Sequence, residues 1–243
     1  MKVLDLSRNW GLISPETQRK IAISSIFLAG CGLGARIAEI AVRTGFKNFI
    51  VADGDKVEAS NLNRQPFFQH QLGKNKAETT RELIVSINPQ ANVQVIPHFL
   101  QTKEEITPLV ERAHFVVNTV DPDETFWTLN EISRTLKKVE LHPLNVGWWS
   151  FVYVSLPDDP PLQEILGGKF YGYELYRKLV ALAPQISLPQ PILEKMDEIV
   201  EGKLPFPQIA PTSAVTATLS VSAMIEWLEN GELKENPIVV RIR

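Results

Sequence analysis

The chain has 243 residues, of which 44% are hydrophobic and 22% charged, so it has ordinary globular composition and enough length to bury a sizeable core. Its net charge of -3 gives no broad basic surface, which argues against nucleic acid as a partner. No apolar run reaches the roughly 18 residues that a membrane span needs, and the opening residues lack a secretory signal, so we expect a cytoplasmic protein without membrane contact.

The first predicted element is a short helix from Pro15 to about Ile21, because Ser14 is a suitable N-cap and proline is favoured in a first helical turn. Apolar runs then alternate with helix-like stretches. The runs are SSIFLA at 24–29, NFIVAD at 48–53, NVQVIP at 92–97 and HFVVNT at 114–119. Amphipathic segments after Gly34 and from Lys74 to Ile87 predict helices lying on a sheet. This βαβαβ rhythm is typical of a parallel sheet.

Further strands are expected near 138–142 and 150–155. Nine of the seventeen prolines then fall between Pro157 and Pro211, which indicates an inserted or crossover lobe. A helix from Ser213 to Glu229 and a final strand at 238–243 follow.

We therefore predict the α/β class, with a Rossmann-like doubly wound, mainly parallel sheet and a C-terminal crossover lobe. The expected divisions are a nucleotide-binding core with an N-terminal helix at 1–156, the lobe at 157–211, and a helix and strand returning to the core at 212–243.

A glycine-rich loop, AGCGLG at 29–34, stands between the first strand and its helix. Gly30, Gly32 and Gly34 would let backbone amides approach a phosphate at the helix N-terminus, or would serve only to pack a tight turn. Asp53 comes nineteen residues after Gly34, at the end of the second strand, where a carboxylate can accept hydrogen bonds from a ribose. The single cysteine, Cys31, is expected to be a small buried loop residue.

Cations follow this loop, as a triphosphate requires. Arg64 and Lys76 are candidates to hold the phosphates, and Asn61 and Gln65 could orient them, although solvated surface charge is the alternative for each cation. A nicotinamide-dependent dehydrogenase would have no use for this SNLNRQ segment, so we rank that class last.

Two further carboxylates complete the predicted site. Asp121 follows the run FVVNTV, so it should lie at the carboxyl end of a strand, where it can hold Mg2+. Asp123 is expected to cap the next helix instead. Asp55 is a second candidate for the ribose.

These residues resemble those of the ThiF, MoeB and HesA family and of the adenylation domains of ubiquitin-activating enzymes. The resemblance runs from about Leu6 to Ser155 and rests on motifs that arrive in order. They are the glycine loop, DxDxVxxSNLNRQ, Gly-x-x-Lys at 73–76, INP at 87–89 and Asp121. One departure is the loop itself, because the family pattern Gly-x-Gly-Gly-Leu-Gly is replaced here by Ala29 and Cys31 at its first and third positions.

The resemblance implies ATP and Mg2+ as cofactors, with Asp53 on the ribose, Arg64 and Lys76 on phosphates, and Asp121 on the metal. It also implies a homodimer in which Arg8, in the segment SRNWGL, reaches the phosphates of the partner subunit. The implied reaction joins a carboxylate to the α-phosphate as an acyl-adenylate, and the substrate is a peptide or the tail of a ubiquitin-like protein.

Many members of the family carry a catalytic cysteine and two Cys-x-x-Cys zinc pairs, and this chain has neither. We therefore expect no thioester step within the chain. Two alternatives stay open: an enzyme like the transfer-RNA threonylcarbamoyladenosine dehydratases, and a nucleotide-binding scaffold without catalysis.

Overall fold

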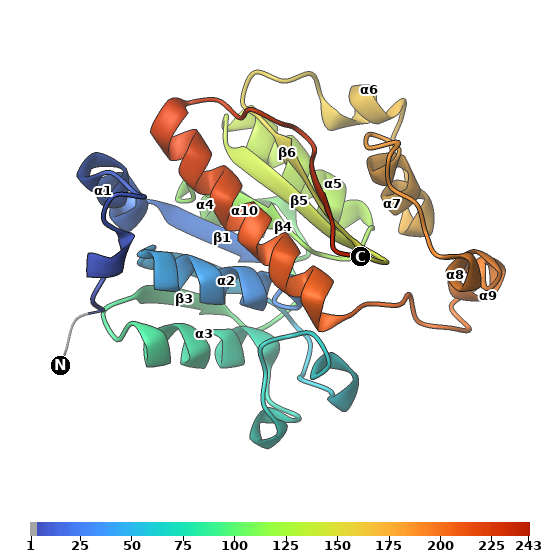
Figure 1. Ribbon diagram of the computed structural model, residues 1–243, viewed down its shortest axis with the longest axis horizontal. Coiled ribbons are helices and arrows are strands. Elements are labelled where there is room, and N and C mark those ends of the chain that lie inside the picture. The colour runs from blue at the N-terminus through green and yellow to red at the C-terminus, as the bar shows by residue number, and fades with distance from the viewer. Residues whose placement is uncertain (1–3) are drawn as a thin grey trace.

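The computed structural model describes residues 4–243, so the first three residues of the predicted core lie outside the described part. Seven strands form one sheet in the order β3-β2-β1-β4-β5-β6-β7 (Figure 1). They are β1 (Ser25–Ala29), β2 (Asn48–Ala52), β3 (Asn92–Ile96), β4 (Phe115–Asn118), β5 (Val139–Val146), β6 (Trp149–Ser155) and β7 (Ile238–Arg241). Strands β1 to β5 are parallel to one another, whereas β6 is antiparallel to β5 and β7. The mainly parallel sheet is thus confirmed.

Helices cover both faces of the sheet, which makes it doubly wound (Figure 1). One face carries α1 (Pro15–Ile23), α2 (Leu33–Thr44), α3 (Lys76–Ile87) and α10 (Ala210–Asn230), which share one buried cluster. The other face carries α4 (Lys103–Glu111) and α5 (Glu124–Thr135), which share a second cluster. Three 3-10 turns, η1 (Ser7–Asn9), η2 (Ala59–Asn61) and η3 (Gln69–Gln71), lie in the connections.

Local capping explains where several helices begin and end. The Ser14 hydroxyl accepts a hydrogen bond from the Thr17 amide at 3.0 Å, as expected for the start of α1. The Asp123 carboxylate accepts from the Thr125 amide at 2.8 Å, which confirms it as the cap of α5. Gly45 ends α2 in the left-handed conformation with φ of 114°, a geometry that favours glycine.

Helix α4 was not anticipated, because Pro108 lies inside it and proline normally interrupts a helix. The Thr102 side chain caps its first turn, and Glu104 and Glu105 complement the helix dipole there. Ile106, Leu109 and Val110 are then buried against the sheet. Capping and burial together outweigh the lost backbone hydrogen bond.

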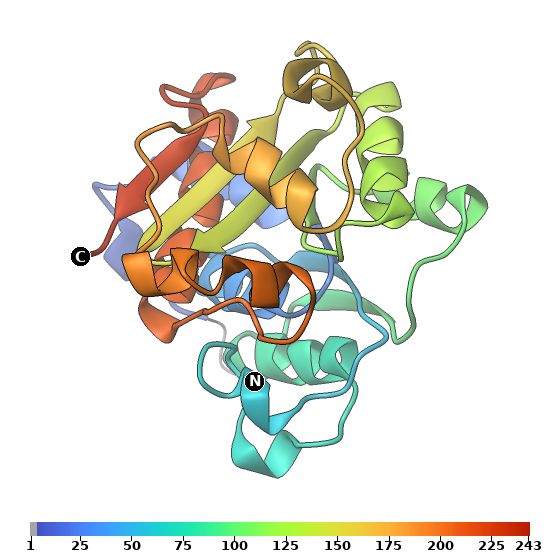
Figure 2. The same ribbon diagram turned by 90° about the vertical axis from the view of Figure 1, so that its right-hand side faces the viewer.

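The proline-rich segment between β6 and α10 forms four short helices. They are α6 (Leu162–Leu166), α7 (Gly172–Val180), α8 (Gln190–Leu193) and α9 (Met196–Val200). α6 and α7 pack on Trp127 of α5 and Phe151 of β6 in a third cluster. In Figure 2, α8 and α9 cross in front of one end of the sheet.

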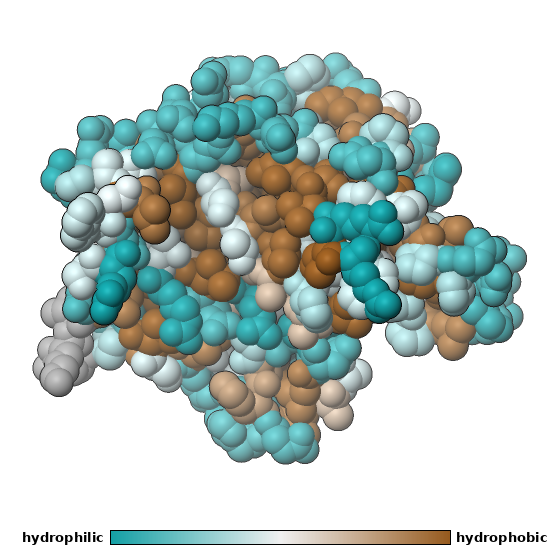
Figure 3. Space-filling view, in the orientation of Figure 1, coloured by the Kyte–Doolittle hydropathy of each residue, from teal (hydrophilic) through white to brown (hydrophobic). Residues whose placement is uncertain are grey.

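The surface mixes polar and apolar side chains. Figure 3 shows apolar side chains reaching the surface between polar ones on the face that carries α10. None of the helices within residues 4–243 is long and apolar enough to cross a membrane.

Candidate nucleotide and acyl site

A cavity of about 490 Å³ lies at the carboxyl ends of the parallel strands. Strand order reverses between β1 and β4, and open α/β sheets bind ligands at such a point. The walls of the cavity include Gly32 before α2, Asp53 after β2, Asp121 after β4, and residues of α7 and α9 from the proline-rich segment. Segments far apart in sequence therefore enclose one space. A smaller cavity of about 160 Å³ adjoins it and shares Asp53, Asp55 and Asp121.

The three loop glycines have different structural roles. Gly30 has φ of +95°, and a Cβ there would lie 2.5 Å from the Thr119 carbonyl oxygen, so only glycine allows this close approach. Gly32 lines the large cavity at the N-terminus of α2, and Gly30 lines the smaller cavity. Gly34 lies inside α2, where an added Cβ would make ordinary contacts with Thr119 Oγ1 at 3.5 Å and Leu28 Cβ at 3.7 Å. The predicted phosphate approach therefore falls on Gly32 and Gly30, while Gly34 packs the helix on the sheet.

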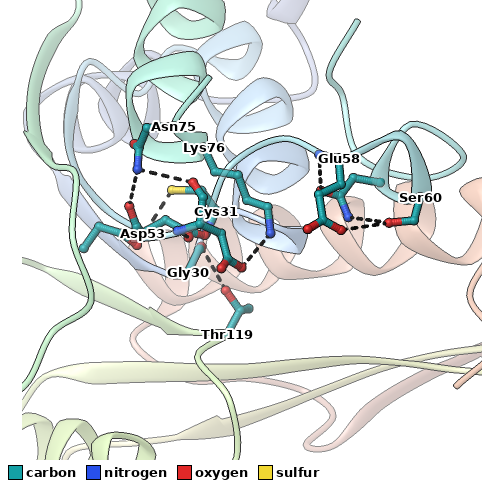
Figure 4. Close-up of polar contacts among 11 residues, drawn as sticks. Gly30, Cys31, Asp53, Glu58, Ser60, Asn75, Lys76 and Thr119 are labelled. Atoms are coloured by element: carbon teal, nitrogen blue, oxygen red, sulfur yellow. Dashed lines mark hydrogen bonds and ion pairs between the residues drawn. The ribbon is translucent and has the colours of Figure 1, made fainter. Parts of the chain in front are cut away.

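Cys31 occupies the loop position where the family pattern has glycine. Its side chain is fully buried, and burial together with the nearby Asp53 carboxylate raises the pKa of the thiol. Its backbone N–H donates to Asp53 Oδ2 at 2.7 Å (Figure 4). Cys31 is thus a buried loop residue, as expected, and its amide orients Asp53.

The two predicted ribose carboxylates sit side by side. Asp53 accepts from the amides of Cys31 and Asp55, at 2.7 and 2.8 Å, and burial raises its pKa more than these donors lower it. Asp55 forms an ion pair with Lys76, whose Nζ lies 2.8 Å from Asp55 Oδ2. Lys76 is buried at the start of α3 and lines the large cavity. A phosphate that binds Lys76 must therefore compete with Asp55.

The SNLNRQ segment places its three candidates differently. Gln65 is buried and lines the cavity. Asn61 accepts from the Glu58 amide at 3.0 Å, so it shapes its own turn. Arg64 donates to the Ser60 carbonyl and to Asn63 at 2.9 and 2.8 Å, and neither Arg64 nor Asn61 is among the described residues that line the two cavities. Both roles stay predictions.

Asp121 borders both cavities just after β4. Burial is the main cause of its raised pKa, and the neighbouring carboxylates of Asp123 and Asp55 add to the effect. A cation here would relieve that repulsion. Within residues 4–243, no group of three or more His, Cys, Asp or Glu side chains is placed to hold a metal ion. A metal at Asp121 would therefore need further ligand atoms from a bound substrate.

Arg8 lies far from this site within its own chain. It is exposed in η1, whose Asn9 side chain donates to the Thr44 carbonyl at the C-terminal end of α2. Gly32 stands at the other end of that 12-residue helix, about 18 Å away. A role for Arg8 at the phosphates therefore requires a second copy of the chain.

Four residues that line the large cavity carry a buried acceptor without a partner in the described part of the chain, and only Gln65 among them was predicted from the sequence. Gln65 Oε1, Asn118 Oδ1, His142 Nδ1 and Asn145 Oδ1 have no hydrogen-bond partner among the described residues. Gln65 was predicted only as an orienting residue. The available signal was a polar residue inside an apolar strand run, as in FVVN and LHPLNV. Such residues are costly to bury, so their presence points to a use.

Comparisons with known proteins show which family and which fold the chain resembles. A model of the ThiF family matches residues 4–240. The chain is 29% identical over 153 residues to the sulfur carrier protein ThiS adenylyltransferase of Bacillus subtilis, covering 61% of this chain and 45% of that protein. It is 31% identical over 111 residues to SUMO-activating enzyme subunit 2 of Dictyostelium discoideum, covering 45% and 17%.

Among solved structures, that of E. coli MccB with MccA has a TM-score of 0.68 at 20% identity. The superposition covers 93% of this chain and 62% of that one, and it shows a shared fold. The chain spans less than half the length of the curated relatives it matches.

Proposed function

The chain belongs to the ThiF family, and on that premise we propose that it is an ATP-dependent adenylyltransferase that activates a carboxylate as an acyl-adenylate. The observation that carries the proposal is the single cavity bordered by Gly32, Asp53, Lys76 and Asp121. These are a helix N-terminus, a carboxylate suited to a ribose, a cation and a carboxylate suited to a metal.

The donor set fits ATP in three respects. The N-terminus of α2 favours negative charge beside Gly32. Each Asp53 oxygen already accepts one amide hydrogen bond and keeps a lone pair for a ribose hydroxyl. Asp55 already pairs with the Lys76 ammonium group, so a phosphate that binds this group would replace Asp55.

Asp121 fits Mg2+, which proteins commonly hold through one or two carboxylates together with substrate phosphates. The metal would neutralise charge on the phosphates and on the departing pyrophosphate. In the proposed reaction, a substrate carboxylate oxygen forms a bond to the α-phosphorus. The bond from that phosphorus to the oxygen bridging the β-phosphate breaks, and pyrophosphate leaves with the electron pair.

The shortage of positively charged side chains at the large cavity supports the predicted homodimer. The large cavity is bordered by three carboxylates, those of Asp53, Asp55 and Asp121. Among the described lining residues, Lys76 is the one lysine or arginine. ATP itself brings roughly four negative charges. Arg64 of the same chain and Arg8 of a second copy would balance this excess. Trp10 and Leu12 beside Arg8 are 84% and 86% exposed, and such apolar residues favour a subunit contact.

The acyl group would not pass to a thiol of this chain, because Cys31 is buried and its pKa is raised. We propose that the adenylate is released to an outside nucleophile, and that the acyl substrate is a peptide C-terminus or the tail of a ubiquitin-like or sulfur-carrier protein. The sulfur-carrier and SUMO-activating relatives support this substrate class.

ATP–pyrophosphate exchange tests the proposal directly. The assay would use the purified chain with synthetic peptides that end in a free carboxylate, and with the same peptides amidated at the C-terminus. We expect exchange with the free carboxylates, none with the amidated controls, and loss of exchange in EDTA. Nucleotide binding without exchange for any carboxylate would overturn the proposal in favour of a scaffold.

A further inference from the structure

The large cavity extends beyond Asp121 to the ends of β4 and β5. The last aligned pair on these parallel strands is Val117 with Leu141, so Asn118 and His142 follow as neighbours. Because side chains alternate along a strand, both lie on the face that carries α5. Both line the cavity. Three residues of extended chain span at most about 11 Å, so this region is within reach of a substrate held at Asp121.

The Asn118 amide has a defined orientation. Its nitrogen donates to the Phe126 carbonyl at 3.1 Å and to Glu140 Oε1 at 2.8 Å. The Phe126 carbonyl can only accept, so the NH2 group must face it. Asn130 donates to the second Glu140 oxygen at 2.7 Å, which holds that carboxyl group in place. Asn118 Oδ1 is left as an acceptor without a partner in residues 4–243.

His142 supplies a second acceptor beside it. Its Nε2 lies 3.1 Å from the Ser155 hydroxyl and 3.9 Å from Glu140 Oε2. These oxygens favour a proton on Nε2, which leaves Nδ1 as a lone-pair acceptor. Burial lowers the pKa of this imidazole to about 3, so the ring is neutral near pH 7. Nδ1 also lacks a partner among the described residues.

We propose that Asn118 and His142 form a subsite for an uncharged side chain with two N–H donors, namely a primary amide, on the acyl substrate. The inference rests on the proposed function and names the substrate class for it. A primary amide brings two hydrogens to two acceptors, whereas a hydroxyl brings one and a carboxylate brings none. An ammonium group would meet only these two neutral acceptors here, because Glu140 is not among the described residues that line the large cavity.

The opposite wall suits the oxygen of such an amide. Tyr173 and Tyr176 of α7 line the same cavity. Burial raises the pKa of both phenols, so their hydroxyls remain protonated and able to donate. The two acceptors on the strands are themselves buried, so binding of the amide would require the α7 wall to move outward.

The first test uses the unaltered protein and three octapeptides that differ only in a C-terminal Gln, Met or Glu. These side chains have similar length, but only Gln donates hydrogen bonds. Leaving buried acceptors unpaired costs about 1–3 kcal/mol, so we expect a kcat/KM in ATP–pyrophosphate exchange roughly 10- to 100-fold higher for Gln than for Met, with Glu lowest. Equal values for Gln and Met would overturn the subsite and leave the proposed function standing.

The second test uses Asn118→Leu, which nearly keeps the volume and removes the acceptor. The preference for Gln over Met should fall to about twofold or less. Asn88→Leu is the matched control, because Asn88 is equally buried at the C-cap of α3 and is not a lining residue. The Asn88→Leu variant should keep the preference for Gln over Met even if it is less stable. A preference that survives Asn118→Leu would overturn the assignment, and His142→Phe serves the same purpose if that variant does not fold.

Calorimetric titration of the three peptides separates the two proposals. Gln-selective binding without exchange would support the subsite and overturn the adenylyltransferase. Exchange without selectivity for Gln in either assay would support the adenylyltransferase and overturn the subsite.

Discussion

The two ends of the large cavity differ in how their polar groups are satisfied. At the glycine-loop end the charged groups pair with the protein itself, as Lys76 does with Asp55 and Asp53 does with two backbone amides. At the β4–β5 end the groups are neutral or buried, and three acceptors, on Asn118, His142 and Asn145, have no partner among residues 4–243. A ligand must therefore exchange partners at the first end, whereas it adds partners at the second. The first end suits a charged group that comes and goes, and the second suits selection between similar neutral groups.

Replacing Asp121 should have the largest effect, and it separates the charged end from the helix that follows. We expect Asp121→Ala to reduce ATP–pyrophosphate exchange about 1000-fold, because a metal-binding carboxylate is lost where charge develops. Asp123→Ala is the matched control two residues away. It removes the cap of α5 and a neighbouring negative charge, so it should cost about 1 kcal/mol of stability and lower exchange far less than Asp121→Ala does. Similar losses of exchange in both variants would contradict the role given to Asp121.

Glu140, the buried carboxyl group at the β4–β5 end, should make the stability of the fold depend on pH. Burial raises the pKa of Glu140 from 4.5 to about 7, so the folded chain keeps a proton that the unfolded chain loses across this range. Its contribution to stability is complete below pH 4.5 and is lost as the pH rises to about 7.

Glu140→Gln removes this titration. Relative to the variant, the unaltered protein should lose about 3 kcal/mol of unfolding free energy between pH 4.5 and 7.5. His142 has the opposite dependence, and because it is present in both proteins it largely cancels in the difference. Urea unfolding at the two pH values measures the effect, and a difference that does not change with pH would refute it.

The Lys76 ion pair tests whether the charged end truly exchanges partners. We expect Lys76→Met to lower exchange about 100-fold, since a buried cation beside the cavity is removed. Lys74→Met is the control, because Lys74 is exposed and pairs with Glu82 at 3.1 Å on the same segment. If both lysines proved equally dispensable, Lys76 would be a structural partner of Asp55 and no phosphate ligand.

The close contact between Gly30 and Thr119, which joins β1 to β4, is tested by stability alone. Gly30→Ala combines a positive φ with a Cβ placed 2.5 Å from the Thr119 carbonyl, so we expect a loss of about 3 kcal/mol in unfolding free energy. Gly73→Ala shares the positive φ of +82° but meets no atom within 4 Å, and it should cost only about 1 kcal/mol. Equal losses would mean that the close approach to Thr119 contributes nothing.

Local pattern was enough for most of the fold. The pattern of apolar runs and amphipathic segments predicted all seven strands, six of them within about two residues at each end, and the caps at Ser14 and Asp123 were correct. The glycine loop, Asp53, Lys76 and Asp121 were found because their types and spacing follow the ends of predicted strands. β5 runs further than expected, to Val146, and α4, which contains Pro108, was not predicted.

Sequence by itself determined the class, the order of elements and the charged candidates, because these depend on periodicity and on residues close together in the chain. Tertiary structure decided which candidates meet. It placed Gln65, Lys76 and Asp121 on one cavity, left Arg64 on its own turn, and set Arg8 at the opposite end of α2. It alone brought Asn118 beside His142, since the strand register and the burial that leave both without a partner arise only when distant segments pack together.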